Sequence, residues 1–150
     1  MTVLPITEVE RMLSRSERDI RFVLGQAGYL TDSTAKLKTV SDGPLMILLV
    51  YDILTVMRFP ERDILVILAT FSVHLHAVGE KCGAQSKQNF VFQVADNRYA
   101  SLTGLDSVYD IKEMAWLPRI RPPLVSLAIV LPELFRRAAS TLEGPSGQLM

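Results

Sequence analysis

A pair of histidines and a nearby carboxylate are the residues of this sequence with the most evident potential for chemistry. His74, His76 and Glu80 would form a small metal site if their segment were a strand, because side chains two residues apart then share a face. On a helix, the two histidines would point about 200° apart and could not bind the same ion. The sequence holds no third histidine. We therefore expect no metal and no cofactor, and keep a small metal- or ligand-binding domain using these three residues as an alternative.

Two other reactive side chains, Cys82 and Asp52, stand alone in the sequence. A single cysteine without a motif that orients a base beside it is typical of a small packed side chain and of a reducing compartment. Asp52 interrupts an apolar run, so we expect it to meet a partner's donor or to lie at the edge of an interface. The sequence has no glycine-rich phosphate loop, nucleophile elbow or paired carboxylates. We therefore do not expect an enzyme.

The elements that carry these residues are predicted to be two strongly apolar helices. Pro44 and Pro60 each open an apolar run, and proline fits the first turn of a helix. Because only Arg58 and Phe59 separate the runs, the helices should lie antiparallel as a hairpin. Apolar side chains extend most of the way around both helices, so we expect a second copy to cover them in a four-helix bundle. The predicted dimer contacts are Leu45, Leu48, Leu49, Asp52, Val56, Ile64, Ile67, Leu68 and Phe71.

The segments on either side of the hairpin carry weaker patterns. Thr7 and Glu10 form a capping-box pattern before one amphipathic helix that ends at Gly28, and residues 29–43 are predicted to be mostly loop. Residues 85–102 favour a helix, and a β-hairpin near residues 89–102 is the alternative. A helix capped by Asp106 or Ser107 should end before Pro118. Residues 124–131 fit a strand or a short helix, and a last helix starts at residues 132–133.

A proline-rich segment after residue 115 is suited to lie across a neighbouring subunit. Its prolines make it extended and stiff, so little entropy is lost when it docks. Tryptophan and arginine are favoured as binding anchors. The predicted contacts between dimers are Trp116, Pro118, Arg119, Ile120, Arg121, Pro122 and Pro123.

The composition indicates one domain without a strong charge. The chain has 150 residues, of which 49% are apolar and 21% charged, with 16 basic and 16 acidic side chains. A domain that binds nucleic acid mainly by neutralising phosphates carries a basic excess, so this balance argues against that class. The start of the chain lacks a signal-peptide pattern, and both apolar stretches fall below the ~18–20 residues of a spanning helix. We expect one helical assembly domain over residues 1–143, a disordered tail over 144–150 and no membrane insertion.

The order of several motifs resembles the core (capsid) proteins of hepadnaviruses and of their non-enveloped fish-virus relatives, the nackednaviruses. Residues 60–66 resemble the start of the second helix in that family's dimerising hairpin. Residues 88–102 resemble the helix after the hairpin's kink, and residues 105–116 resemble the next helix. Residues 116–123 and 131–133 resemble the family's proline-rich arm and the end of its assembly domain. The likeness covers roughly residues 44–133.

This resemblance implies a viral capsid protein with a mostly α fold. Two chains would dimerise through their hairpins, and the arm would join dimers into an icosahedral shell around the genome. The sequence largely lacks the arginine-rich tail with which that family binds packaged RNA or DNA, so Arg136 and Arg137 are the candidate nucleic-acid contacts. We expect a structural protein of the virion, present in the host cytoplasm during assembly. A cytosolic helical adaptor is a further alternative.

Overall fold

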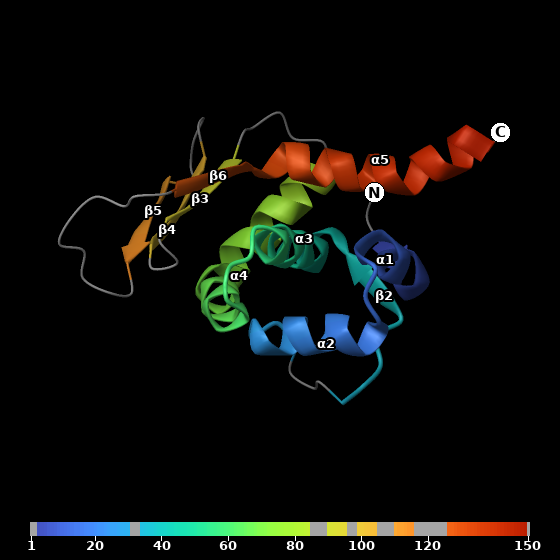
Figure 1. The fold of residues 1–150 in the computed structure, drawn as a ribbon, viewed down its shortest axis with the longest axis horizontal. Coiled ribbons are helices and arrows are strands. Elements are labelled where there is room, and N and C mark those ends of the chain that lie inside the picture. The colour runs from blue at the N-terminus through green and yellow to red at the C-terminus, as the bar shows by residue number, and fades with distance from the viewer. Residues whose placement is uncertain are drawn as a thin grey trace.

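The computed structural model describes residues 3–30, 34–84, 90–95, 99–104, 110–115 and 126–149. The chain is mostly helical, as predicted. Figure 1 shows a central pair of helices, α3 and α4, with α2 below them, α1 to one side, and α5 and a small sheet above.

The N-terminal region forms two helices where the sequence predicted one. α1 spans Ile6–Leu13 and α2 spans Glu17–Gln26. Ser14 adopts a left-handed conformation with φ 54°, which ends α1, and the Ser16 hydroxyl accepts a hydrogen bond from the Asp19 amide, which starts α2. The single-helix prediction is therefore wrong, because a serine cap inside the apolar pattern outweighs its periodicity. α2 ends before Gly28, whose φ of 77° fits the predicted stop.

The predicted capping box at Thr7 and Glu10 is also wrong. The residue before α1 is Pro5, and no side chain caps that end. Glu10 instead accepts a hydrogen bond from the Glu17 amide at 2.8 Å. Its carboxylate thus caps the first turn of α2 rather than of its own helix.

A two-stranded ribbon joins the start of the chain to the segment after α2. β1 (Val3–Pro5) pairs antiparallel with β2 (Thr39–Ser41), with Leu4 opposite Val40. The predicted loop over residues 29–43 therefore ends in a short strand. This pairing brings the end of the loop back beside the start of α1.

The central helices form the predicted hairpin. α3 spans Asp42–Val56 and α4 spans Glu61–Gly83. At the tip of the hairpin, the Tyr51 hydroxyl donates a hydrogen bond to Glu61 at 2.8 Å. At the other end, α4 passes the first turn of α3 so closely that a Cβ at Gly79 would overlap the Asp42 carbonyl oxygen. Contacts at both ends make the two helices antiparallel, as the short connection required.

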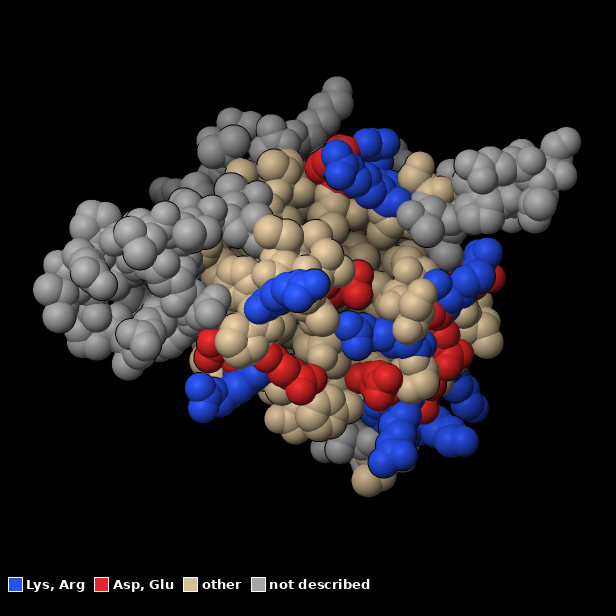
Figure 2. Space-filling view, viewed as in Figure 1, with Lys and Arg blue, Asp and Glu red and all other residues tan. Residues whose placement is uncertain are grey.

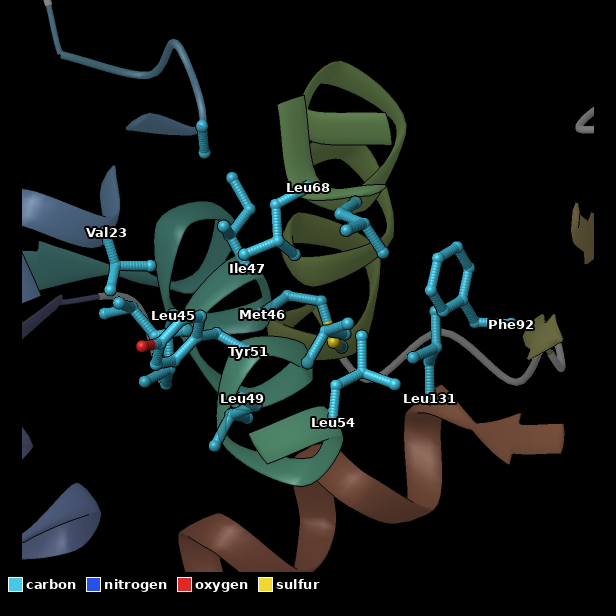
Figure 3. Packing of buried hydrophobic residues seen from close by; sticks show 14 of the residues in the cluster. Val23, Leu45, Met46, Ile47, Leu49, Tyr51, Leu54, Leu68, Phe92 and Leu131 are labelled. Carbon is cyan, nitrogen blue, oxygen red and sulfur yellow. The ribbon is translucent and has the colours of Figure 1, made fainter. Parts of the chain in front are cut away.

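Most of the predicted dimer contacts are buried inside the single chain. Only Asp52 and Val56 of that set keep accessible side chains, and the others have relative exposures of 5% or less: Leu45, Leu48, Leu49, Ile64, Ile67, Leu68 and Phe71. Figure 3 shows the side chains that cover the hairpin. Val23 of α2 lies on one side of α3, and Phe92 of the sheet and Leu131 of α5 lie on another. The chain's own elements therefore bury these seven side chains, and a dimer through the hairpin stays a prediction.

The region after the hairpin is an antiparallel sheet rather than two helices. Its strands are β3 (Phe90–Ala95), β4 (Tyr99–Gly104), β5 (Asp110–Ala115) and β6 (Ser126–Val130), in the order β5-β4-β3-β6. The helices predicted over residues 85–102 and up to residue 116 are therefore wrong, and the alternative β-hairpin is correct. Phe90, Phe92 and Val94 are all buried. Their two-residue alternation is the pattern that a strand needs to place three side chains in one core.

The final helix, α5, spans Leu131–Leu149 and follows β6 directly. It begins where the sequence predicted and runs through most of the segment for which we expected disorder. The predicted arm at residues 116–123 lies outside the described residues.

Candidate functional site

α1 and α2 form a compact two-helix unit joined by a three-residue turn, Ser14 to Ser16. Figure 1 shows the two helices crossing steeply, with α1 seen nearly end-on and α2 lying across the view. Buried Val9 and Leu13 of α1 share a core with Ile20 of α2. Two short helices at a steep angle with a turn of this length are the geometry of a helix-turn-helix unit.

Arg15 fixes this turn to the hairpin. Its Nε lies 3.7 Å from an Asp52 carboxylate oxygen, and its guanidinium lies 4.9 Å from the centre of the Tyr51 ring. Burial raises the pKa of Asp52, and the charge of Arg15 counteracts that rise. Asp52 thus pairs with a cation of its own chain, whereas the sequence suggests a partner's donor or the edge of an interface.

Two polar side chains of α2 hold the loop that follows it. Glu17 accepts a hydrogen bond from the Leu37 amide at 3.0 Å, and Arg21 donates one to the Thr34 carbonyl at 2.7 Å. Arg21 and Glu17 also form an ion pair at 3.3 Å. These contacts place the loop over residues 34–38 directly beside α2.

The outward side of this unit carries a run of solvent-exposed side chains, here called the α2 surface and defined as Arg18, Phe22 and Gln26 together with Lys36 and Lys38. The three α2 members follow at four-residue spacing and so share one face of the helix. Phe22 is 49% exposed, which is unusual for so large an apolar side chain.

A shallow groove lies along the α2 surface. Its volume is about 490 Å³, and its lining includes Arg18, Phe22, Gln26 and Thr34. Figure 2 shows blue Lys and Arg side chains projecting at the lower edge of the molecule, where Figure 1 places α2 and the loop after it. This surface therefore combines exposed cations, an exposed ring and an amide on one small unit.

His76 and Glu80, two of the three residues of the metal-binding alternative, lie on helix α4. Their side chains form an ion pair at 3.1 Å, and Tyr29 stacks on the His76 ring at 5.5 Å between ring centres. Because the segment is helical, His74 points away from this pair. Among the described residues, no group of three or more His, Cys, Asp and Glu side chains is placed to hold a metal ion. The geometry therefore gives no support to the metal-binding alternative.

A small cavity of about 210 Å³ lies beside this pair, lined by Asp42, Glu80 and adjacent small residues. Asp42 is buried, and desolvation raises its pKa. Nearby, burial and the charge of Asp42 raise the pKa of the Cys82 thiol to about 11. A thiol with so high a pKa stays protonated near neutral pH and is a poor nucleophile.

Arg136 and Arg137, the predicted nucleic-acid contacts, lie exposed on α5. Both bind the same acceptor, because each donates from Nε to Glu133, at 2.9 and 3.0 Å. Arg136 also donates from Nη2, and the hydrogen bonds from the two arginines lower the pKa of Glu133 to about 2. Their positive charge is thus partly neutralised within the helix, unlike that of the cations on the α2 surface.

The sequence signal that would have located the α2 surface is the motif around Ser14 and Ser16. A capping serine with an acidic residue three positions later marks the start of a new helix, here at Glu17. The apolar periodicity that continues through both helices favoured one long helix, so this start signal was not recognised. The arrangement of α2 with the loop over residues 34–38 depends on the Glu17 and Arg21 contacts and has no local sequence signature.

No known protein family, curated protein or solved structure matches this chain. By length and composition, one helix in the described part of the chain, α4, is apolar enough to cross a membrane, and 39% of its apolar window is buried inside the fold. Core helices of water-soluble proteins pass the same test. Because none of these comparisons suggests a function, the case for the α2 surface as a functional site rests on its geometry alone.

Proposed function

We propose that this protein binds double-stranded DNA through the α2 surface. The observation that carries the proposal is that a short helix, held across its neighbour by a three-residue turn, presents Arg18, Phe22 and Gln26 beside two exposed lysines. In helix-turn-helix proteins the second helix lies in the major groove, and its first turns contact base edges. α2 is the second helix of its unit, and its exposed face carries Arg18, Phe22 and Gln26.

Each member of the α2 surface has a contact that suits its chemistry. Arg18 can donate two hydrogen bonds to a guanine or to a phosphate, and Gln26 can pair with the edge of an adenine. The Phe22 ring can pack against a thymine methyl group. Lys36 and Lys38 lie on the neighbouring loop, where they can bind phosphates and so fix the register of α2. Arg21 positions the loop, because its Nη1 donates to the Thr34 carbonyl and its Nε pairs with Glu17.

The local distribution of charge supports this proposal although the whole chain is neutral. Three of the four acidic side chains of the two-helix unit are engaged within it: Glu8 pairs with Arg11, Glu10 caps α2, and Glu17 holds the loop. The fourth, Asp19, is exposed in the first turn of α2. Arg18, Lys36 and Lys38 are exposed. A single copy with so few cations would bind DNA weakly, in the range of about 10⁻⁴–10⁻⁶ M typical of non-specific binding.

The experiment is a titration of the full chain into a labelled random-sequence duplex of about 25 base pairs, at about 50 and 200 mM salt. We expect binding that weakens steeply with salt. The triple variant R18A/K36A/K38A should bind at least about tenfold more weakly at low salt, with a salt slope smaller by about 2–3.

The matched control is the double variant R136A/R137A, which removes exposed arginines from α5. It should leave the affinity for the duplex unchanged. If this variant loses as much affinity as the triple variant, the contact lies on α5, as the sequence had suggested. Absence of wild-type binding at low salt would overturn the proposal.

A second candidate is the shell-forming subunit implied by the family resemblance. The antiparallel hairpin favours it, together with an apolar outer face on α4 that includes exposed Val66 and Val73. The strands at residues 90–95 and 110–115 count against it, because the resemblance implied helices there. If this candidate is correct, electron microscopy of the purified protein at raised salt will show uniform hollow particles. A homogeneous small species would exclude it.

A further inference from the structure

The outer face of α4 carries a continuous stripe of accessible side chains. The outer stripe is defined as Arg62, Val66, Ala69, Val73, Ala77 and Glu80. Spacings of three and four residues keep its members on one side of the helix. Val73 is 76% exposed and Val66 is 44% exposed, so the middle of the stripe is apolar surface in contact with water.

The opposite face of α4 is fully used by the core. Ile64, Phe71 and Val78 are buried there, and Phe71 packs edge-to-face on Phe92 at 5.2 Å between ring centres. Helix α4 therefore has two apolar sides, and the chain covers only one of them in the part that the structure describes. Its 23 residues give the stripe a length of about 35 Å or less.

The residues of the outer stripe are arranged symmetrically about its middle. Arg62 and Glu80 lie nine residues on either side of position 71, and Ala69 and Val73 lie two residues on either side. Val66 and Ala77 are centred between positions 71 and 72. A second copy of α4 placed antiparallel would bring each member of these pairs opposite its counterpart, as a two-fold interface requires.

The charges at the two ends select the antiparallel orientation. The Arg62 side chain is 89% exposed. Glu80 pairs with His76 within the chain, and its side chain is still 66% exposed. In a parallel pair, Arg62 would meet Arg62 and Glu80 would meet Glu80, and like charges repel. In an antiparallel pair, two Arg62–Glu80 ion pairs would close the interface, one at each end.

The sizes of the central side chains also suit this pairing. Ala69 of one copy would face Val73 of the other, so a small residue always meets a larger one. Helix axes can approach to about 8–10 Å when small side chains lie at the contact. The valine methyl groups would then fill the space that the alanines leave.

We propose that the protein forms a two-fold dimer by antiparallel packing of the outer stripes of two α4 helices. This interface differs from the bundle expected from the sequence, because it uses the outside of the hairpin and leaves the core residues within each chain. It stands whether or not the α2 surface binds DNA. If the α2 surface does bind DNA, the dimer carries two α2 surfaces. Two-fold helix-turn-helix dimers bind two half-sites in this way.

The test measures the mass of the full chain by sedimentation equilibrium, with circular dichroism as the check on folding. Wild type should be a dimer at about 100 µM. Val73→Glu places two carboxylates in the apolar centre and should give a folded monomer. Val56→Glu is the matched control, because Val56 is exposed at the hairpin tip outside the stripe, and it should remain a dimer.

A charge-swap series tests the orientation. R62E should weaken the dimer at least about tenfold, since the reversed side chain would face Glu80 of the second copy. E80R should do the same from the other side. The double variant R62E/E80R should restore most of the affinity, because opposite charges meet again. Failure of the double variant to recover would overturn the antiparallel pairing.

Two other outcomes would also overturn the proposal. Wild type could be monomeric at this concentration, or Val56→Glu could dissociate the dimer as strongly as Val73→Glu does.

Co-sedimentation with vesicles of phosphatidylcholine and phosphatidylglycerol completes the test. If monomeric wild type binds these vesicles and Val73→Glu does not, the outer stripe faces a lipid surface rather than a second copy.

Discussion

Gly79 of α4 lies directly against the backbone of Asp42 at the start of α3. A Cβ at position 79 would overlap the Asp42 carbonyl oxygen and would lie 2.8 Å from Cβ of Met46. The two helices of the hairpin therefore meet backbone to backbone at this end. This contact also sets the position of the cavity between Asp42 and Glu80.

Replacing Gly79 with alanine should destabilise the protein. The added methyl group must push α3 and α4 apart, and overpacking of this kind costs about 1–3 kcal/mol. The better helix propensity of alanine returns at most about 1 kcal/mol, so the net effect is a loss. Urea unfolding measures it. Ala139→Gly on α5, at a partly exposed position outside both proposed surfaces, is the control and should cost about 1 kcal/mol from propensity alone. A Gly79→Ala protein as stable as wild type would contradict the close contact.

The turn between α1 and α2 predicts opposite effects for two nearby serines. Ser16→Ala removes the acceptor for the Asp19 amide and should destabilise the protein by about 1 kcal/mol. Ser14→Gly should stabilise it by about 1 kcal/mol or less, because glycine adopts φ 54° without strain. Thermal unfolding of the two variants compares them directly. Equal shifts in the same direction would show that the helix break is not set by these residues.

Alanine substitutions at two phenylalanines should have different effects on stability and on DNA binding. Phe71 is fully buried against Phe92, so Phe71→Ala should lose about 3–5 kcal/mol of stability. Phe22 is half exposed on the α2 surface, so Phe22→Ala should change stability by about 0.5 kcal/mol or less while weakening DNA binding. Unfolding and duplex titration on both variants give the comparison. A large stability loss in Phe22→Ala would assign that ring to the core instead.

The partly buried thiol of Cys82 predicts a pH dependence. Its pKa of about 11 in the folded chain exceeds the ordinary value near 9, because burial and Asp42 disfavour the thiolate. The group therefore contributes stability below pH 9 that is lost as pH rises through 11. Alkylation by iodoacetamide, followed by mass spectrometry, should show a midpoint near 11 when folded and near 9 in urea. The same midpoint in both states would mean that the thiol is open to solvent.

The hairpin was predictable because its determinants are local. Pro60 and the acidic residues after it start α4, and the apolar runs on both sides of a four-residue connection leave only an antiparallel arrangement. The strands near residues 90–104 were less accessible to prediction. Phe90, Phe92 and Val94 alternate as a strand, but other residues of the same segment keep helical spacing, and such short patterns are ambiguous.

The sequence by itself determined that two apolar helices form a hairpin and that both need cover on several sides. Only the tertiary structure decided what supplies the cover, since hydrophobic burial is non-directional and any apolar surface satisfies it. Val23, Phe92 and Leu131 of the same chain take the place assigned to a second copy (Figure 3). The same choice left Val66 and Val73 on the outside of α4 and Phe22 on α2. The α2 surface and the outer stripe consist of side chains that the core leaves exposed. No local sequence pattern shows which apolar side chains will remain exposed.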